Sequence, residues 1–521
     1  MAPAVAEVVE ESIIERLVAA DKVRWWKKPN LRRLYLLLVP FCLFIESTSG
    51  FDSSMMNGMQ ALSYWKDYFN HPKGGELGLL VACYNLGAIT SIPLVAVVSD
   101  HLGRRKSIVL GSTIMIIGAI MQGLSRNLAM FVFSRIFLGH GIVYAIISGA
   151  ALLGELGHPK ERHFLGSMFN AFFGVGSVLG AGIVVRTVLI PNDWSWRLPS
   201  MLQAVPSVIQ LVFAFTVPES PRWLVSKDRS EEALEILIKY HAEGDAAAEL
   251  PHVELAEIRK ALEMENDSRQ RGWAELFQSK GMRHRALVAA GLGIFVQYSG
   301  NNLISQYLVP ILEKIGIKDS HTQVRYNVGS EAWGFLMALI IATISPRYPR
   351  RRMYLLCASC LLCVYTTWTI AQARNRITGS KETGYAVLVM IFLYKPAYNI
   401  AYNALTYVYM VELFPYYVRT KGLSWFQLFN RCAVMLGSFT NPIGLENLDW
   451  KFLFVFIALL SFEIVFIYFL FPETYGKTLE ELTFLFDDEK QNRATLAASA
   501  AKVVGHGTDF TEIHEAPEKK A

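Results

Sequence analysis

Charged residues are scarce in this chain. Asp, Glu, Lys and Arg make up 18% of its 521 residues, against roughly 25% in a typical soluble domain. Hydrophobic residues make up 52%, and the mean hydropathy is positive at +0.29. This balance argues against a soluble protein and against a nucleic-acid-binding protein. It predicts a protein embedded in a lipid bilayer.

Other absences narrow the class further. The first 30 residues are polar and include acids, so no secretory signal or transit peptide is evident. The six cysteines all fall in apolar stretches, which excludes a disulfide framework. The sequence has no recognisable set of nucleophile and base and no nucleotide-binding loop. We therefore expect neither an enzyme nor a protein that needs a cofactor or a metal.

Long apolar segments recur along the chain. A helix needs about 20 apolar residues to cross a hydrocarbon core about 30 Å thick, and twelve segments come close to this length. Their approximate bounds are 34–56, 77–99, 107–124, 128–153, 164–186, 197–217, 286–308, 326–345, 353–373, 384–411, 421–445 and 451–471. These segments are longer than the short alternating strands of a membrane barrel. The sequence predicts an all-α membrane protein with twelve transmembrane helices.

Basic residues just before the first span favour a cytoplasmic N-terminus. They are Lys22, Arg24, Lys27, Lys28, Arg32 and Arg33. Twelve crossings then return the C-terminus to the same side. The expected organisation is a cytoplasmic tail over 1–33, a six-helix half over 34–217, a helical cytoplasmic loop over 218–285, a second six-helix half over 286–471 and a cytoplasmic tail over 472–521.

Short signals of the first half return in the second. "DHLGRRK" at Asp100 is echoed by "PRYPRRR" at Pro346, "ELGHPKER" by "ELFPYYVR", and "PES" by "PET", with offsets of 246, 257 and 254 residues. The order is the same in both halves, which indicates a duplicated six-helix unit. Two such halves, related by an axis along the membrane normal, are typical of a transporter with its substrate site at the midplane.

The charged signals of this repeat lie at predicted cytoplasmic helix ends. They are Asp100, Arg104, Arg105, Glu155, Arg162, Glu412 and Arg419. Opposite charges there would pair across helices when an inner gate is closed and separate when it opens, forming a two-state latch. The alternative is that the arginines only enforce topology, but topology needs no acids at these positions.

Six motifs in one order carry a family resemblance. They are "DHLGRRK", "RIFLGHG" from Arg135, "GELGHPKER", "PESPRWL" from Pro218, "VELFPYYVR" and "PETYGKTLEE" from Pro472. Together they resemble the sugar porter family of the major facilitator superfamily over residues 34–486. The motifs add to the latch the residues Gly103, Glu219, Arg222 and Glu473.

Three less usual stretches resemble the fungal lactose permease and related disaccharide and hexose transporters. They are "SGFDSSMMNGMQ", "VQYSGNNLISQYLVPIL" and "AYNALTYVYMVELFPYYVRTKG". The resemblance implies uptake of a sugar, either a disaccharide such as lactose or cellobiose or a hexose, across a fungal plasma membrane. We expect a monomer.

A carboxylate, Asp52, lies near the end of the first span in "FIESTSGFDSSMMNG". It is 18 residues into a helix that enters from the cytoplasm, roughly 27 Å deep, and Arg135 is about seven residues into a helix that enters from outside. We therefore expect the two at similar depth. An acid beside an arginine holds a proton weakly until the arginine withdraws. The proton-coupled sugar porters have both residues, which implies proton symport through Asp52 and Arg135.

Other charged residues also fall inside predicted spans. They are Glu46, Glu331, Lys395, Arg431 and Glu463. Glu46 is six residues before Asp52, roughly 120° around a helix, so the two cannot point into the same place. For the others, pairing of Lys395 with an acid and plain helix packing remain equal alternatives.

Sugar hydroxyls are recognised by amide side chains, which donate and accept, and by aromatic faces. The seventh span offers Gln297, Asn301, Asn302, Gln306 and Tyr307. Further candidates are Asn170, Gln203, Asn403 and Tyr407.

The resembled family has two adjacent glutamines followed by an asparagine in span seven, and here Val296 stands at the first glutamine. Many members have glutamine at Asn170, and in span ten Asn403 and Tyr407 replace the usual glycine and tryptophan. These departures leave the sugar open. The remaining alternatives are a facilitator without proton coupling, a sugar sensor, and a carrier of a polyol or another metabolite.

Overall fold

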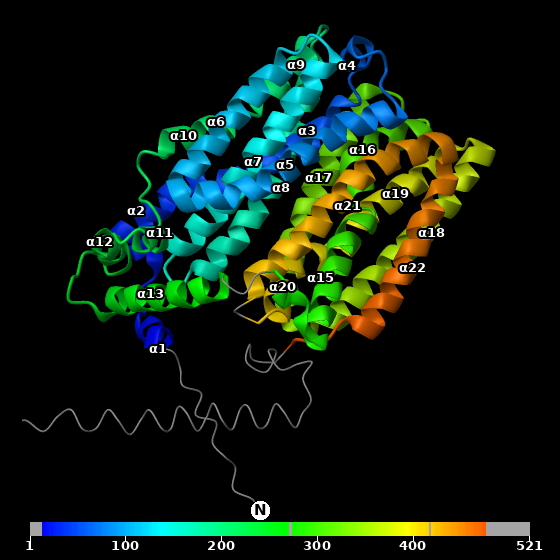
Figure 1. Cartoon of the computed structure of the whole chain (residues 1–521). Helices are drawn as coiled ribbons and strands as arrows, with labels where there is room; N and C mark the ends of the chain where they lie inside the picture. The colour runs from blue at the N-terminus through cyan, green and yellow to red at the C-terminus, as the bar shows by residue number, and fades with distance from the viewer. Residues whose placement is uncertain (1–12, 270–272, 416–417, 476–521) are drawn as a thin grey trace, which may run out of the picture.

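The computed structural model describes residues 13–269, 273–415 and 418–475. Within these ranges the secondary structure is helical, and the long helices form two bundles (Figure 1). The N-terminal bundle is blue to green in Figure 1, and the C-terminal bundle is green to orange. The architecture is thus the expected all-α membrane fold in two halves.

The N-terminal bundle consists of six long helical segments. They are α2 (Pro29–Leu38) continued through the π-helical turn η2 (Val39–Leu43) into α3 (Phe44–Met59), α5 (Gly74–Leu102), α6 (Arg104–Gly123), α7 (Leu128–Leu156), α8 (Arg162–Thr187), and α9 (Trp194–Leu202) followed by α10 (Val205–Phe213). Three short elements accompany them, α1 (Ile13–Ala20), η1 (Trp25–Lys27) and α4 (Ser63–Tyr68).

The C-terminal bundle also consists of six segments. They are α15 (Lys280–Tyr298) with α16 (Asn301–Lys314), α17 (Ser320–Ile344) with η3 (Ser345–Arg347), α18 (Arg350–Thr378), α19 (Lys381–Tyr398) with η4 (Asn399–Asn403) and α20 (Thr406–Leu413), α21 (Arg419–Leu448) with η6 (Asp449–Phe452), and α22 (Leu453–Leu470). The twelve segments agree with the twelve predicted spans.

Two of the twelve segments are too interrupted to count as continuous membrane-spanning helices. Nine stretches of the described residues are long and apolar enough to cross a membrane, and one of them, Lys421–Leu470, contains both α21 and α22. The two segments outside these stretches are α9 with α10 and α15 with α16. Neither break was predicted. The second separates α15 from α16. It lies at Gly300, whose φ of +103° places it in the left-handed region, and a Cβ there would lie 1.7 Å from the Tyr365 hydroxyl.

Glycines let the helices of the N-terminal bundle touch backbone to backbone. A Cβ at Gly139 of α7 would lie 1.8 Å from the carbonyl oxygen of Tyr84 in α5, and one at Gly87 of α5 would lie 2.1 Å from that of Ile136. Small residues at helix crossings permit this close approach in membrane proteins. The α5–α7 crossing therefore depends on both glycines.

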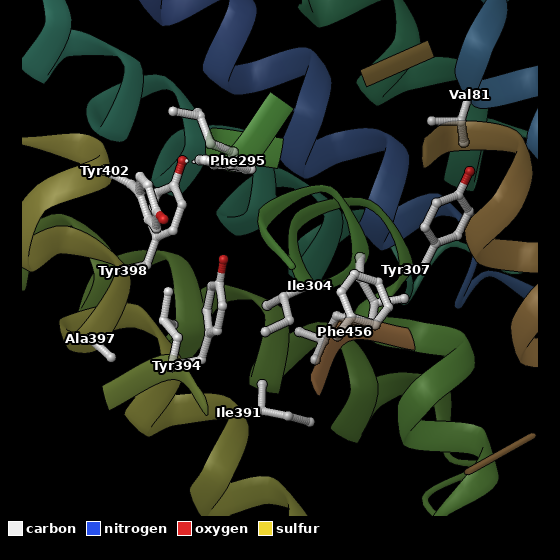
Figure 2. Packing of buried hydrophobic residues seen from close by; sticks show 14 of the residues in the cluster. Val81, Phe295, Ile304, Tyr307, Ile391, Tyr394, Ala397, Tyr398, Tyr402 and Phe456 are labelled. Carbon is white, nitrogen blue, oxygen red and sulfur yellow. Dashed lines mark hydrogen bonds between the residues drawn. The ribbon is translucent and has the colours of Figure 1, made fainter. Parts of the chain in front are cut away.

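Several tyrosines lie in the core of the C-terminal bundle. Figure 2 shows Tyr394, Tyr398 and Tyr402 close together on the yellow helices α19 and η4. The rings of Tyr394 and Tyr398 stack with centroids 5.7 Å apart, and the Tyr402 hydroxyl donates to Glu463 Oε2 at 2.8 Å. Glu463 is thus buried within the bundle core.

Three helices of the central segment cover one end of the N-terminal bundle. They are α11 (Pro221–Ser226), α12 (Ser230–His241) and α13 (Glu249–Arg269), and α14 (Glu275–Gln278) follows before α15. Figure 1 shows α13 lying across this end of the bundle. Glu243 fixes the arrangement, because its carboxylate accepts the backbone N–H groups of Asn30 and Leu31, each at 2.9 Å. We call this end of the molecule the loop face and the opposite end the far face.

Candidate functional site

Asp52 of α3 and Arg135 of α7 form an ion pair inside the N-terminal bundle. An Arg135 guanidinium N–H donates to Asp52 Oδ1 at 2.7 Å, and the two residues are only 5% and 2% exposed. The ring of Tyr84 lies 5.2 Å from the Arg135 Cζ atom. Each charge compensates the other, as buried ions require. The structure brings together the residues that the sequence placed at similar depth, and their role in proton transfer stays a prediction.

A polar stripe of α3 joins the two bundles. Asn57 donates to Asn327 Oδ1 of α17 at 3.2 Å. Gln306 of α16 donates to the Ser53 hydroxyl at 3.0 Å, and Gln60 donates to the Gln306 carbonyl at 2.7 Å. Among the predicted sugar-binding residues, Gln306 is therefore one that reaches across to the other bundle.

The two bundles approach each other most closely toward the far face. Lys66 of α4 and Glu313 of α16 add an ion pair there. In Figure 1, α3 and α16 lie close together at the upper end, and the bundles diverge toward α13 and α20 at the loop face. The helices in contact between the bundles include α3, α5 and α8 on one side and α16, α17 and α21 on the other.

Other span-seven candidates bond to α21 within the C-terminal bundle. Gln297 donates to Asn430 Oδ1 at 2.9 Å, and Asn302 donates to a backbone carbonyl of α21 at 2.8 Å. The Tyr307 hydroxyl donates to the Ser438 carbonyl at 2.5 Å. Tyr307 is fully buried at a kink, with φ −131° and ψ 26°. In this conformation Tyr307 supports the packing of α16 on α21, and its contact with a substrate stays a prediction.

The remaining candidates are more accessible. Asn170 of α8 and Asn403 of η4 are exposed, and Asn301 is half-buried. Tyr407 of α20 is 46% exposed, and its hydroxyl accepts a hydrogen bond from Gln427 at 2.9 Å. These groups belong to both bundles, and their contact with a ligand between the bundles stays a prediction.

Gln203 does not reach the junction between the bundles. It is buried at the end of α9, and its amide donates to Gln122 Oε1 of α6 at 3.1 Å. The helices that α9 contacts include α3, α4, α6 and α8, all of the N-terminal bundle. Gln203 therefore braces this bundle, contrary to the expected substrate contact.

The charged residues of the first repeat meet at the loop face. Arg104 of α6 pairs with Glu155 of α7 at 3.4 Å and with Asp100 of α5 at 3.5 Å. The Ser220 hydroxyl also donates to Glu155. Arg162 begins α8 and is exposed, and Arg222 lies in α11.

The second repeat builds the same arrangement. Glu412 of α20 pairs with Arg350 of α18 at 3.1 Å and accepts the Thr474 hydroxyl at 2.6 Å. Arg419 begins α21. These pairs join helices within each bundle, and they are formed although the bundles diverge at the loop face (Figure 1). A latch that opens and closes with an inner gate stays a prediction.

A carboxylate caps the corresponding helix in each repeat. Glu219 accepts the first two backbone N–H groups of α6 at 3.1 and 3.2 Å, those of Arg104 and Arg105. Glu473 accepts the first two of α18 at 2.8 and 3.2 Å. Gly103 admits the Glu219 carboxylate, because its φ is +93° and a Cβ there would lie 2.5 Å from Glu219 Oε2. The motif acids thus satisfy free N–H groups at positive helix ends.

Sequence reasoning missed several of these contacts. Arg350 had a signal, because "PRYPRRR" repeats "DHLGRRK". Ser53, Asn57 and Gln60 follow an i, i+4, i+7 spacing, which marks one polar side of a helix. That stripe could have been found from the sequence, whereas its partners on α16 and α17 could not.

A separate group of titratable residues is buried where α12 docks at the loop face. The rings of His158 and His241 meet edge to face with centroids 5.2 Å apart. His241 bonds to Glu254 of α13 at 2.7 Å and to the Leu156 carbonyl at 3.2 Å. His158 Nδ1 lies 3.4 Å from Glu161, and its Nε2 has no hydrogen-bond partner among the described residues.

This geometry predicts a pH-dependent docking of α12 and α13. Burial, with the charge of His241, lowers the pKa of His158 from 6.5 to about 3. The docked state therefore resists protonation, and docking weakens by about 1.4 kcal/mol per pH unit as pH falls below 6.5. We expect amide hydrogen exchange in α12 and α13, corrected for intrinsic rates, to be faster at pH 5.5 than at 7.5.

His158→Asn should remove much of this pH dependence. His252→Gln is the matched control, because His252 is an exposed histidine of α13, and it should leave the dependence intact. Equal protection of the wild type at both pH values would contradict the prediction.

The sequence and fold were compared with known proteins. Residues 39–486 match the family model described as "Sugar (and other) transporter". The MFS-type transporter criB of Aspergillus cristatus is 27% identical over 88% of this chain and 96% of its own length. The high-affinity glucose transporter of Kluyveromyces lactis is 24% identical over 89% and 86%. The inward-open xylose transporter XylE from E. coli aligns with a TM-score of 0.72, with 20% identity, over 87% of this chain and 100% of its own.

The family match covers most of the chain, and the structural likeness covers both bundles. Both agree with the resemblance seen in the repeated motifs. The chain therefore belongs to the sugar transporter family of the major facilitator superfamily, a family of membrane transporters.

Proposed function

We propose that this chain imports a sugar across the plasma membrane by proton symport. The observation that carries the proposal is the buried Asp52–Arg135 pair. An unpaired ionised acid at this depth is costly, so Asp52 takes up a proton when Arg135 moves away and releases it when the pair reforms. Because this movement is linked to the closure of the bundles around a sugar, the flux of protons is coupled to the flux of sugar.

The arrangement of the bundles supports alternating access. With both termini in the cytoplasm, as the basic residues before α2 favour, the far face is extracellular and the loop face cytoplasmic. The polar contacts of α3 with α16 and α17 then close the outer side. Rocking of one bundle against the other would break these contacts and bring the repeated charge pairs of the loop face together across the junction.

The substrate class follows from the accessible polar groups and from the relatives. Amides and a tyrosine of both bundles suit a polyhydroxylated ligand. The Kluyveromyces relative is named a glucose transporter, and XylE is named a xylose transporter. The proposal covers hexoses, and it extends to disaccharides such as lactose and cellobiose because three stretches of the chain resemble the fungal lactose permease.

External pH reports the proposed reaction directly. Glucose, galactose, lactose and cellobiose would be added in turn to unbuffered cells that express the chain. Alkalinisation of the medium with one of them, removed by a protonophore, is the expected result. Uptake of a sugar without any pH change would make the chain a facilitator.

Reversing the charge of Lys66 should slow uptake by weakening the outer closure. The side chains of Lys66 and Glu313 are 27% and 40% exposed, so the pair contributes about 0.2–1 kcal/mol, up to roughly a fivefold shift between two states. We expect initial uptake to fall by up to this factor in Lys66→Glu and to recover when Glu313→Lys is added.

The control for this exchange is the Lys314–Asp449 pair, which lies at 2.8 Å within the C-terminal bundle. Swapping these two charges should leave uptake near the wild-type rate. A Lys66→Glu, Glu313→Lys protein no faster than the single variant would contradict the assignment.

A further inference from the structure

A second ion pair lies inside the C-terminal bundle, between α17 and α19. Lys395 Nζ lies 3.1 Å from Glu331 Oε1, and each side chain is 13% exposed. Gly334 gives the lysine room, because an added Cβ there would lie 3.1 Å from Lys395 Cδ. Burying two charges is expensive, and an apolar pair of the same volume often stabilises a protein as well or better. The pair therefore invites a functional explanation.

Glu331 faces the N-terminal bundle. It lies one turn from Asn327 and one turn from Phe335 along α17, so the three residues share one side of the helix. Asn327 bonds to Asn57 of α3 at 3.2 Å. Gly174 of α8 lies directly against the Phe335 ring, where a Cβ would come within 2.3 Å. Contacts on both sides thus point Glu331 toward the junction between the bundles.

Lys395 begins a row of polar groups that leads toward the loop face. Asn399 donates to the Lys395 carbonyl at 2.8 Å, and Asn403 donates to Asn399 Oδ1 at 2.5 Å. Asn403 is exposed, and Tyr407 follows one turn later with 46% exposure. The ion pair is therefore continuous with the groups assigned to sugar binding.

We propose that Glu331 and Lys395 select substrates by charge, admitting a neutral polyhydroxylated molecule and rejecting one that carries a carboxylate. This inference rests on the proposed function and adds to it a determinant of specificity. Glu331 accepts a substrate hydroxyl and Lys395 donates to one. Glu331 lies on the side of α17 that faces the other bundle, so a substrate carboxylate there approaches its negative charge first and must displace Glu331 to reach Lys395. Repulsion of this kind discriminates between ligands of the same shape.

Glucuronate and glucose test the proposal, because they share one ring and differ at a single carboxylate. Both would be used as inhibitors of the uptake of whichever sugar the cells accumulate, at pH 6, where glucuronate is ionised. We expect the wild type to bind glucuronate at least about tenfold more weakly than glucose. Glu331→Gln removes the repelling charge and leaves Lys395 uncompensated, so glucuronate should then bind at least about tenfold more tightly than in the wild type, relative to glucose.

A double variant protects the test against misfolding of Glu331→Gln, which leaves a buried lysine unpaired. Glu331→Gln with Lys395→Gln removes both charges, so we expect its ratio of glucuronate to glucose affinity to lie between the other two. The inference alone would be overturned by a double variant that takes up sugar and keeps the wild-type ratio of glucuronate to glucose affinity. It would also be overturned by a wild type that binds both ligands equally. A wild type that takes up no sugar would overturn the proposed function and this inference with it.

Discussion

Cells that carry Asp52→Asn are expected to lose sugar accumulation and to keep sugar exchange. The amide has nearly the shape of the acid, yet it cannot carry a proton between the two sides. For one proton per sugar, each unit of pH difference supports about tenfold accumulation, since both correspond to about 1.4 kcal/mol. The internal concentration should therefore fall from well above the external one to equality with it. Uptake of labelled sugar to steady state measures this.

Exchange separates a coupling defect from a folding defect. Cells preloaded with unlabelled sugar should still take up labelled sugar through Asp52→Asn, because exchange needs only movement of the loaded carrier. Asp67→Asn is a matched control, since Asp67 of α4 is an exposed acid paired with His71 at 3.2 Å. It should accumulate sugar as the wild type does. Persistent accumulation in Asp52→Asn would exclude Asp52 as the proton carrier.

Gly139→Val should destabilise the N-terminal bundle severely. The new Cβ would lie 1.8 Å from the Tyr84 carbonyl oxygen, a backbone atom that no rotamer change can move. Helices α5 and α7 must then separate, and overpacking of this kind costs about 3 kcal/mol or more. We expect the melting temperature of the purified protein to fall by more than about 5 °C.

The control lies on the same helix. Gly154 of α7 has no atom within 4 Å of its added Cβ, so Gly154→Val tests the cost of a β-branched residue in α7 without a clash. That cost is a few tenths of a kcal/mol or less. Equal loss of thermal stability in both variants would show that the close contact at Gly139 does not limit stability.

The helices could be predicted because apolar length is a local property of the sequence. The repeated motifs likewise located both sets of loop-face charges. The depth of Asp52 in its span predicted that Arg135 would lie near it. Local patterns did not reveal the break at Gly300, where φ is positive and the Tyr365 hydroxyl of another helix leaves no room for a Cβ.

Side-chain direction across helices was the other missing information. Gln203 and Tyr307 have the chemistry of sugar ligands, and the structure turns both into their own bundles. The sequence did not decide whether Lys395 pairs with an acid such as Glu331 or only packs between helices. The structure shows the ion pair, because it places α17 beside α19. Sequence spacing orders residues around one helix and says little about which neighbour each side will meet.

Purified protein in sealed liposomes provides the most direct test of proton coupling. The lumen would be held alkaline and the outside made acidic by one pH unit, with labelled sugar added outside and the membrane potential clamped at zero. Proton symport predicts accumulation to about tenfold above the external concentration, and its collapse when a protonophore is added. Equilibration at the external concentration, with the pH gradient intact, would contradict proton symport and identify a facilitator.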